Sequence, residues 1–408
     1  MSGAYDGLRV VDFTHIIAGP FCTRLLADHG ADVVKVEPFA GDVMRQLKAS
    51  YAPDLSSAFA QYNCGKRSIA IDLKSERGHR VVLDLIAWAD VVVENFALGT
   101  LDRLDLGYER MREVNRDVIL CSISSFGSYG PYSPIPGYGV VAEAYSGLMS
   151  LASDEGSTPT HFGTPLADMN SGTHALAAIG AALYRRERSG EGTHIDISCF
   201  DTLVAMIDQS LSLEAFTHGE QRMDHYGSRH NTVVPSSVVR VGNGDHVTYG
   251  AVGDVFFRRF AAAMERPDLA DDARFRTNDD RVANRHELYD MIEAWALGFP
   301  DGASLVARLA QDGIPSARVR AVAELSGDPH LVARGTLAPI DIPGVGRVLL
   351  QTAPHPMTGA DVAPRGAAPH LGEHTRDVLE EILGLDAASV DGLIADDVVR
   401  AAAMEVRA

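Results

Sequence analysis

The sequence predicts an α/β fold, with a large Rossmann-like domain on a doubly wound, mostly parallel sheet and a smaller α+β domain. Short apolar segments alternate with longer segments of helical periodicity over the first half of the chain, as expected when crossover helices join parallel strands. A chain of 408 residues with 46% hydrophobic residues is long enough for two domains. The composition also changes after about residue 217, which predicts a second domain there.

The strands of the predicted sheet are short runs of β-branched and other apolar residues. They cover residues 8–13, 31–37, 68–73, 91–93 and 118–123. Helices are predicted between them, because the residues after Pro20, after Ser75 and over 108–114 place apolar side chains at helical spacing. This alternation of strand and helix is typical of a doubly wound sheet.

A buried helix is predicted over residues 170–186, followed by a left-handed stop at Gly190. Apolar residues recur there at helical spacing among alanines, at Leu176, Ile179 and Leu183. Asp168 lies just before the predicted first turn, with Asn170 or Ser171 as the cap. A carboxylate there faces free N–H groups and the positive end of the helix, which favour its ionised form at neutral pH. An ordinary helix cap is the alternative for Asp168.

Composition narrows the possible functions. The formal net charge is −19, from 36 basic and 55 acidic residues, which disfavours nucleic acid and anionic membranes as partners. The four cysteines have no C-x-x-C spacing and the N-terminus has no cationic, apolar signal, so a cytoplasmic protein is expected. The fifteen histidines show no metal-ligand spacing, so no metal is expected. The motifs of serine hydrolases, zinc proteases and P-loop enzymes are absent, which leaves a carboxylate as the leading nucleophile.

The turn after the first strand lacks the glycine fingerprint of dinucleotide-binding folds. It reads THIIAGP over residues 14–20 rather than G-x-G-x-x-G, which disfavours NAD or FAD. Several cations nevertheless lie near predicted strand ends, where phosphates are commonly bound. They are Lys66, Arg67, Lys74 and Arg103.

These segments resemble the signature of the family III coenzyme A transferases of the formyl-CoA transferase type, a superfamily shared with the α-methylacyl-CoA racemases. The resemblance covers nearly the whole chain and is carried by the motifs FTHIIAGPF, NCGKRSI, ENFALGTLDRL, GTPLADMNSG, GIPSARV and GEHT. In that family the aspartate of a G-x-P-x-x-D segment attacks an acyl thioester. The resemblance therefore implies that Asp168 is the catalytic nucleophile. A backbone N–H near a helix start can stabilise the oxyanion of the tetrahedral intermediate, and Ala18 and Met169 are the candidate donors.

The resemblance also implies where coenzyme A binds, as a substrate rather than as a resident cofactor. The backbone next to its pantetheine and thioester end is that of His15, Ile17 and Ala18. The residues at its nucleotide end are Lys74, Asn95, Phe96 and Arg103. The loop over the acyl end contains Gly137 and Tyr138. Ala97 and Pro38 depart from the family pattern, because many relatives have basic residues there.

Tyr138 bears on the choice of reaction. The racemases have a histidine at this position, and two-base proton exchange at an α-carbon needs such a partner. The tyrosine favours acyl transfer, while a racemase or epimerase and a non-catalytic acyl-CoA-binding protein remain alternatives.

The acceptor acid is less defined by sequence. Ile17 replaces a polar residue of relatives that act on very small oxoacids, so formate and oxalate are not expected. Arg229 or His230 is a candidate partner for the second carboxylate of an acid such as succinate, and both are equally compatible with a surface role. Gly250 begins a possible lid at residues 250–253, for which a structural turn is the equal alternative.

The expected domain ranges follow from these segments. A large coenzyme A-binding domain covers 1–217, a linker 218–233, and a small α+β domain 234–322. A return segment covers 323–371, and residues 372–408 complete the large domain. Relatives form an interlocked homodimer in which each chain is an open ring threaded by the other, so the resemblance implies such a dimer.

Overall fold

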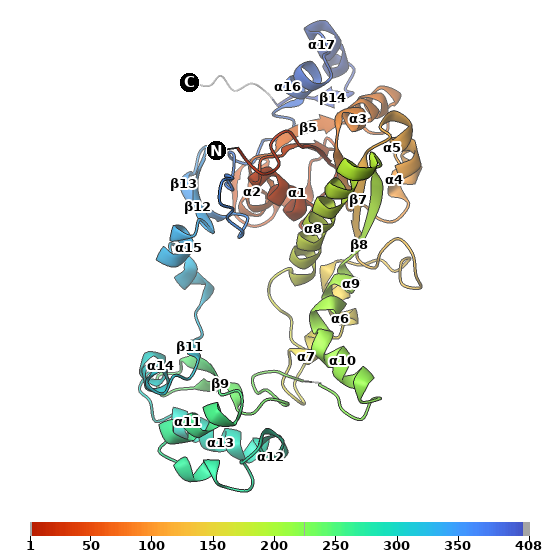
Figure 1. Ribbon diagram of the computed structural model, residues 1–408. Coiled ribbons are helices and arrows are strands. Elements are labelled where there is room, and N and C mark those ends of the chain that lie inside the picture. Colours follow the sequence, from red (N-terminus) through yellow and green to blue (C-terminus); the bar gives the residue numbers. More distant parts are fainter. Residues whose placement is uncertain (1, 224, 403–408) are drawn as a thin grey trace. The chain divides into compact units, whose positions relative to one another are not determined.

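The computed structural model describes residues 2–223 and 225–402 (Figure 1). The chain divides into two compact units. The first unit comprises Met1–Ser146, Gly163–Met206 and Ser326–Ala408. The second comprises Gly147–Phe162 and Ile207–Leu325.

The described residues of the first unit form a seven-stranded sheet in the order β14-β5-β2-β1-β6-β7-β8. The strands are β1 (Arg9–Asp12), β2 (Asp32–Glu37), β5 (Arg67–Ile71), β6 (Val91–Glu94), β7 (Ile119–Ser124), β8 (Thr193–Ser198) and β14 (Val399–Arg400). All neighbours pair in parallel except β14, which is antiparallel to β5. The chain fills one half of the sheet from β1 to β5 and the other half from β6 to β8. The predicted doubly wound, mostly parallel sheet is confirmed, with its order reversing between β1 and β6.

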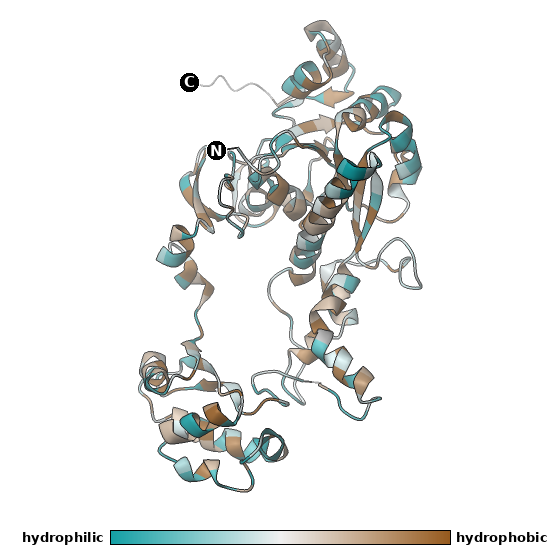
Figure 2. Cartoon of the chain, viewed as in Figure 1, coloured by the Kyte–Doolittle hydropathy of each residue, from teal (hydrophilic) through white to brown (hydrophobic). Residues whose placement is uncertain are grey.

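Helices cover both faces of this sheet (Figure 1). On one face α1 (Ala18–Asp28) packs along α8 (Leu166–Ser189), and on the other α3 (Glu76–Trp88) packs against α5 (Tyr108–Val114). Hydrophobic residues lie on the strands between these layers (Figure 2). The strand residues facing α3 are fully buried, because both faces of a parallel sheet are covered.

Helix α8 differs from the prediction in three respects. It begins at Leu166, with Pro165 as N-cap, so Asp168 lies inside the first turn rather than before it. Asn170 and Ser171 do not cap it, because Asn170 donates to the Thr202 carbonyl and Ser171 to the Asp168 carbonyl. The helix is also only partly buried, since residues such as Tyr184 are exposed. Gly190 ends it in the left-handed conformation with φ 66°, as predicted.

Shorter elements complete the first unit. Near the sheet they are η1 (Val43–Gln46), β3 (Ser50–Ala52), β4 (Leu55–Ser56), α2 (Ser57–Asn63), α4 (Thr100–Arg103), α6 (Gly139–Tyr145) and α9 (Cys199–Val204), followed by η2 (Ala205–Ile207) at the junction with the second unit. The C-terminal part contains α15 (Pro329–Ala333), β12 (Leu337–Ile342), β13 (Gly346–Gln351), α16 (Thr375–Asp377), the π-helix η5 (Val378–Ile382) and α17 (Ala387–Ala395). Helices α9 and α10 (Asp208–Phe216) are separate, with η2 between them.

The second unit has its own core around a small sheet in the order β11-β10-β9. Its strands are β9 (Ser236–Arg240), β10 (His246–Gly250) and β11 (Ser316–Arg318). Its helices are α7 (Leu148–Leu151), α10, α11 (Asp254–Ala263), η3 (Pro267–Ala270), α12 (Asn278–Ala283), α13 (Arg285–Ala296), α14 (Gly302–Gln311) and η4 (Val322–Leu325). Strands β9 and β10 form an antiparallel hairpin, with Gly244 at φ 92° in its turn.

The second unit contains two segments that lie outside the expected small domain. Gly147–Phe162 and α10 both belong to it. Hydrogen bonds connect the first of these segments to the rest of the unit. The Asp154 carboxylate accepts from the backbone N–H and the hydroxyl of Ser228. The Tyr226 N–H also donates to the Leu151 carbonyl. These bonds tie a segment early in the chain to the region expected as a linker.

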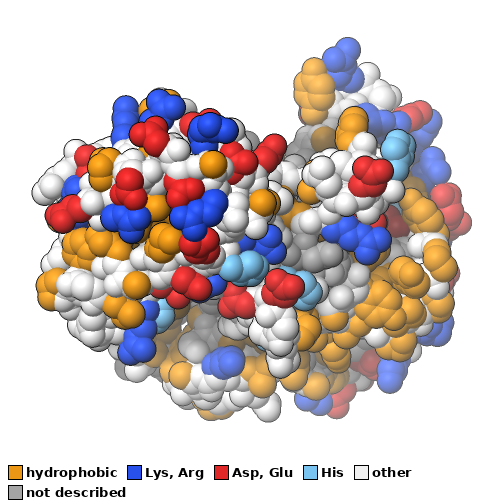
Figure 3. Space-filling view, turned by 90° about the horizontal axis from the view of Figure 1, so that it is seen from below, with side chains coloured by type: hydrophobic (Ala, Val, Ile, Leu, Met, Phe, Trp, Pro, Cys, Tyr) orange, Lys and Arg blue, Asp and Glu red, His pale blue; other side chains and the backbone are white. Residues whose placement is uncertain are grey.

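The surface in Figure 3 shows acidic and basic side chains interspersed with hydrophobic patches. Phe216, Val322 and Tyr129 are 87%, 84% and 82% exposed. Among the helices built from described residues, none combines the length and apolar character needed to cross a membrane.

Candidate active site

Asp168 is held between two helices of the first unit. It is the third residue of α8, and its carboxylate lies against Gly139, the first residue of α6. A Cβ atom placed on Gly139 would be only 2.3 Å from Asp168 Oδ2. One turn further along α8, a Cβ on Gly172 would be 2.7 Å from the carbonyl oxygen of Ala18. These two glycines bring the start of α8 against both α6 and the start of α1.

The pKa of Asp168 moves opposite to the expected direction. Burial and, to a smaller extent, the negative charge of Glu143 together raise it from 3.8 to about 6. The helix N-terminus favours the carboxylate, but here the loss of hydration outweighs that effect. Asp168 is still mostly ionised at neutral pH, because its pKa remains below 7.

The loop between β1 and α1 is fixed by buried charges. Ile16 adopts φ 69°, a conformation that is rare for a β-branched residue. Its N–H donates to the Asp42 carboxylate, at 3.2 Å and 3.3 Å from the two oxygens. Lys35 Nζ is 3.2 Å from Asp42 Oδ2 and 2.6 Å from the Thr14 carbonyl oxygen. Strain of this kind is found where the surroundings force it, commonly at functional sites.

His15 and Asn95 join the ends of the two strands at which the sheet order reverses. Asn95 follows β6, and its side-chain oxygen accepts from the His15 N–H at 2.9 Å. Its amide nitrogen donates to the His15 carbonyl at 2.8 Å. Burial lowers the pKa of the His15 ring. Ligands of doubly wound sheets bind at this reversal, outside the carboxyl ends of the strands.

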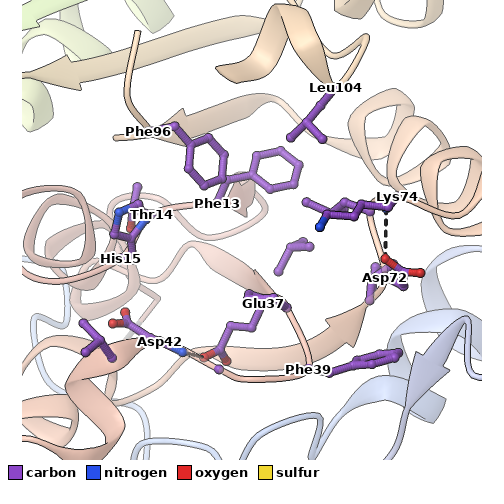
Figure 4. A pocket seen from close by; sticks show the side chains of 16 residues that line it. Phe13, Thr14, His15, Glu37, Phe39, Asp42, Asp72, Lys74, Phe96 and Leu104 are labelled. Carbon is purple, nitrogen blue, oxygen red and sulfur yellow. Dashed lines mark hydrogen bonds between the residues drawn. The ribbon is translucent and has the colours of Figure 1, made fainter. Parts of the chain in front are cut away.

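A cavity of about 550 Å³ opens at this point. It is lined by residues that follow β1, β2, β5 and β6, among them Phe13, His15, Phe39, Lys74, Phe96 and Leu104 (Figure 4). The rings of His15 and Phe96 lie 5.6 Å apart. Figure 4 shows the Lys74 side chain with its amine end directed into the cavity. The cleft is mainly apolar, and its lining includes Lys74 together with the carboxylates of Glu37, Asp42 and Asp72. Its aromatic rings and Lys74 suit a ligand that has both a ring and phosphates.

The four cations selected from sequence have different environments. Lys74 lines the cavity, whereas Arg103 is exposed on α4 and donates to Thr100 at 2.7 Å. Lys66 is buried and paired with Asp12 at 2.9 Å, and Arg67 pairs with Asp32. The expectation that Lys66 and Arg67 are available to phosphates is wrong. They stand at the amino end of β5, whereas ligands approach the carboxyl ends.

The remaining predicted residues of the first unit lie at or next to the starts of α1, α6 and α8. Ile17 is the N-cap of α1 and Ala18 is its first residue. Gly137 packs on Ser125, where a Cβ would be 2.8 Å from the hydroxyl oxygen. Tyr138 is the N-cap of α6 and is 71% exposed. The Met169 N–H donates to the Pro165 carbonyl, so the expectation that it is a free oxyanion donor is wrong.

Arg229, His230 and Gly250 belong to the second unit. Arg229 pairs with Glu293 at 2.6 Å, so its charge already has a partner within this unit. His230 Nδ1 accepts from the Thr232 and Val233 N–H groups, and burial lowers its pKa. Gly250 ends β10, and its N–H donates to the Pro315 carbonyl. Their role in substrate binding stays a prediction.

Glu143 is the side chain next to the candidate nucleophile that sequence analysis missed. It lies on α6, is 1% exposed, and accepts from the Ala167 N–H at 3.3 Å. The available signal was an acid between two alanines in an otherwise apolar helix. Within the described part of the chain, His, Cys, Asp and Glu residues form no group of three or more that could hold a metal ion.

Comparison with known proteins shows the family of the chain. Residues 5–375 match the family described as CoA-transferase family III. The chain is 35% identical over 396 residues to succinyl-CoA:mesaconate CoA-transferase of Haloarcula marismortui, covering 95% of this chain and 98% of that protein. It is 33% identical over 405 residues to formyl-CoA:oxalate CoA-transferase of Streptomyces avermitilis, covering 94% and 97%.

A solved structure extends the likeness to the fold. The crystal structure of a CaiB/BaiF family protein from Brucella suis superposes with a TM-score of 0.82 at 33% identity, covering 94% of this chain and 100% of that one. The matched residues 5–375 include both the motif from His15 to Ala18 and Asp168 on α8. The chain therefore belongs to CoA-transferase family III and is a transferase enzyme.

Proposed function

We propose that this enzyme moves coenzyme A from succinyl-CoA to a short dicarboxylic acid through covalent intermediates on Asp168. The names of the two relatives support this substrate class, because mesaconate and oxalate are both dicarboxylic acids. Ile17 offers an apolar side chain where an acid as small as oxalate would need a polar contact. A longer dicarboxylic acid is therefore the favoured acceptor.

The reaction is a sequence of acyl transfers in which no net proton is taken up. An Asp168 carboxylate oxygen attacks the thioester carbonyl of the donor, the carbon–sulfur bond breaks, and the electron pair leaves on the coenzyme A thiolate. The product is a mixed anhydride. The thiolate then attacks the Asp168 carbonyl carbon, which gives an aspartyl thioester and releases the donor acid as a carboxylate. The acceptor carboxylate runs the same two steps in reverse.

The observation that carries this proposal is the placement of Asp168. Its carboxylate is partly buried, is ionised at neutral pH, and lies against the start of α6. Burial suits an anhydride and a thioester, since both are lost if water reaches them. Because anhydride and thioester preserve the activation of the donor, the reaction needs no ATP and no resident cofactor.

The cavity at the end of β1 and β6 is the proposed site for the nucleotide end of coenzyme A. Phe96 offers an aromatic face, Lys74 a cation for a phosphate, and Arg103 a second cation nearby on α4. Asn95 fixes the His15 backbone, against which the pantetheine would lie. Tyr138 directly precedes Gly139, which contacts Asp168, and this supports a role for Tyr138 in covering the acyl end.

We also propose that two copies of the chain form the interlocked homodimer implied by the sequence. The exposure of large apolar side chains such as Phe216 and Val322 supports a protein partner. A cytoplasmic location is supported by four cysteines that are all free and buried.

The test is to incubate the purified protein with succinyl-CoA alone and then add hydroxylamine. We expect wild type to form an aspartyl hydroxamate at Asp168, visible by peptide mass spectrometry, and to transfer coenzyme A to dicarboxylic acids of a panel. Asp168→Asn should lose both, with turnover lower by at least about 10³-fold.

Asp201→Asn is a matched control, because Asp201 also lies in the first turn of a helix, α9, and is exposed. It should behave as wild type. Full activity of Asp168→Asn would disprove the covalent mechanism. Solvent deuterium entering the α-carbon of a branched acyl-CoA without an acceptor acid would identify a racemase instead.

A further inference from the structure

Glu143 is a buried carboxylate that the proposed reaction does not yet use. It is 1% exposed, and its Oε1 accepts one hydrogen bond, from the Ala167 N–H. Its Oε2 is buried and has no hydrogen-bond partner among the described residues. A buried charge without full compensation is costly. Such a group is therefore expected to have a function.

The geometry directs Glu143 toward the nucleophile. Gly139 and Glu143 are four residues apart on α6, so they lie on the same face of that helix. Gly139 touches Asp168 Oδ2, and Glu143 bonds the residue that precedes Asp168. Two carboxylates therefore face one another across the contact between α6 and the first turn of α8.

We propose that Glu143 is a positioning residue whose charge drives Asp168 toward its acylated form. This inference rests on the proposed covalent mechanism. The free Asp168 carboxylate is repelled by Glu143, whereas the anhydride and the thioester at Asp168 carry no charge. Each acylation step moves the negative charge from Asp168 onto the leaving group, which is the coenzyme A thiolate or the donor carboxylate. The negative charge is then no longer on the Asp168 side chain next to Glu143. Repulsion thus raises the energy of the free nucleophile and is relieved in each covalent intermediate.

The hydrogen bond to Ala167 gives Glu143 a second effect, since it fixes the N-terminal turn that carries Asp168.

Other titratable groups face this part of α8. They are Tyr62 from α2, Cys199 from α9 and Cys22 from α1. Burial raises the pKa of all three, that of Cys199 to about 12, so none of them titrates near pH 6. Among these groups, protonation near pH 6 therefore belongs to Asp168.

Glu143→Gln tests the inference, because glutamine keeps the shape and the acceptor for Ala167 but removes the charge. We expect the acid limb of kcat/KM, near pH 6 in wild type, to move down by about one pH unit or more. The fraction of enzyme held as aspartyl thioester at equilibrium with acyl-CoA should fall about tenfold. The reason is that one pH unit of repulsion between Glu143 and Asp168 corresponds to a factor of about ten in the equilibrium constant. Glu113→Gln, an exposed glutamate on α5, is the control and should change neither quantity.

A second measurement does not depend on turnover. The carboxyl C=O stretch in pH-difference infrared spectra, assigned to Asp168 by its loss in Asp168→Asn, should titrate near pH 6 in wild type and lower in Glu143→Gln. An unchanged midpoint and an unchanged acid limb would overturn the role of Glu143 and leave the covalent mechanism intact. Full exchange activity in Asp168→Asn would overturn the mechanism itself. If Glu143→Gln does not fold, an Asp168 band titrating near 4 in wild type would still overturn the inference.

Discussion

Asp168 shows how two local effects compete at one residue. The N-terminal turn of α8 favours an ionised carboxylate by up to about 1 kcal/mol. Burial and the charge of Glu143 act in the opposite direction, and together they raise its pKa from 3.8 to about 6. Each pKa unit corresponds to about 1.4 kcal/mol, so burial prevails. The Asp168 side chain is therefore ionised at neutral pH, but its ionised form is less stable than that of an exposed carboxylate.

This predicts a pH-dependent gain of stability in Asp168→Asn. The folded pKa lies above the ordinary value, so the folded state binds more protons between about pH 4 and 6, and wild-type stability falls as pH rises through that window. Above it the ionised form costs up to about 3 kcal/mol. Thermal unfolding should give Asp168→Asn a higher midpoint than wild type at about pH 8 and an equal one near pH 4.

Asp201→Asn should show no such pH dependence, because Asp201 is exposed. Asp168→Asn being equally stabilised at both pH values, or destabilised at about pH 8, would contradict the pKa argument.

At the scale of elements, the site depends on how closely α6 approaches α8. The approach is possible because Gly139 has no Cβ, which would otherwise be 2.3 Å from Asp168 Oδ2. The same contact brings Glu143 against Ala167. Sequence periodicity predicted α8 but gave no information on which loop would lie against its first turn. That contact is made by residues about thirty positions earlier in the chain.

Gly139→Ala is expected to displace the Asp168 carboxylate without unfolding the protein. A shift of about 1 Å at a reacting atom is enough to lower kcat by about 10²-fold. KM for acyl-CoA should change little, because the cavity at β1 and β6 does not contain Gly139. Steady-state kinetics together with circular dichroism would test this.

Gly392→Ala on α17 is the matched control. A Cβ there would meet its nearest atom, on Arg77, at an ordinary 3.9 Å, and alanine is the better helix former. Wild-type kcat in Gly139→Ala would show that the carboxylate has room to move.

At the scale of the whole molecule, the chain contains two compact units and crosses between them more than once. Each unit has its own core, one under the large sheet and one around the small sheet. The predicted interlocked dimer would join two such chains, and threading would make their separation slow, since a chain would have to unfold locally to escape.

The dimer prediction is testable by mass and by exchange. Light scattering should give twice the chain mass of 43.7 kDa, unchanged on dilution. Tagged and untagged dimers that are mixed after purification should not exchange subunits over hours, whereas co-expression of the two chains should give mixed dimers. A monomeric mass, or exchange within minutes, would exclude threading.

Much of the fold was predicted from the sequence, because the local spacing of apolar residues indicates where strands and helices form. The alternation from β1 to β8 predicted the doubly wound sheet, and Gly190 predicted the end of α8. The start of α8 was misplaced by four residues, since no side-chain cap marks Pro165. Among the site residues, His15, Lys74 and Phe96 were selected by motif and lie at one cavity.

The sequence by itself determined the family and the sheet and predicted Asp168 as the nucleophile, because motifs and apolar spacing are local properties of the chain. Tertiary structure decided the properties that depend on distant neighbours. Only packing makes Lys66 a buried partner of Asp12 rather than a phosphate ligand, and only burial raises the pKa of Asp168. The position of Glu143 beside Asp168 was likewise found only from the fold, since the charge and hydration at a buried site depend on which residues pack beside it.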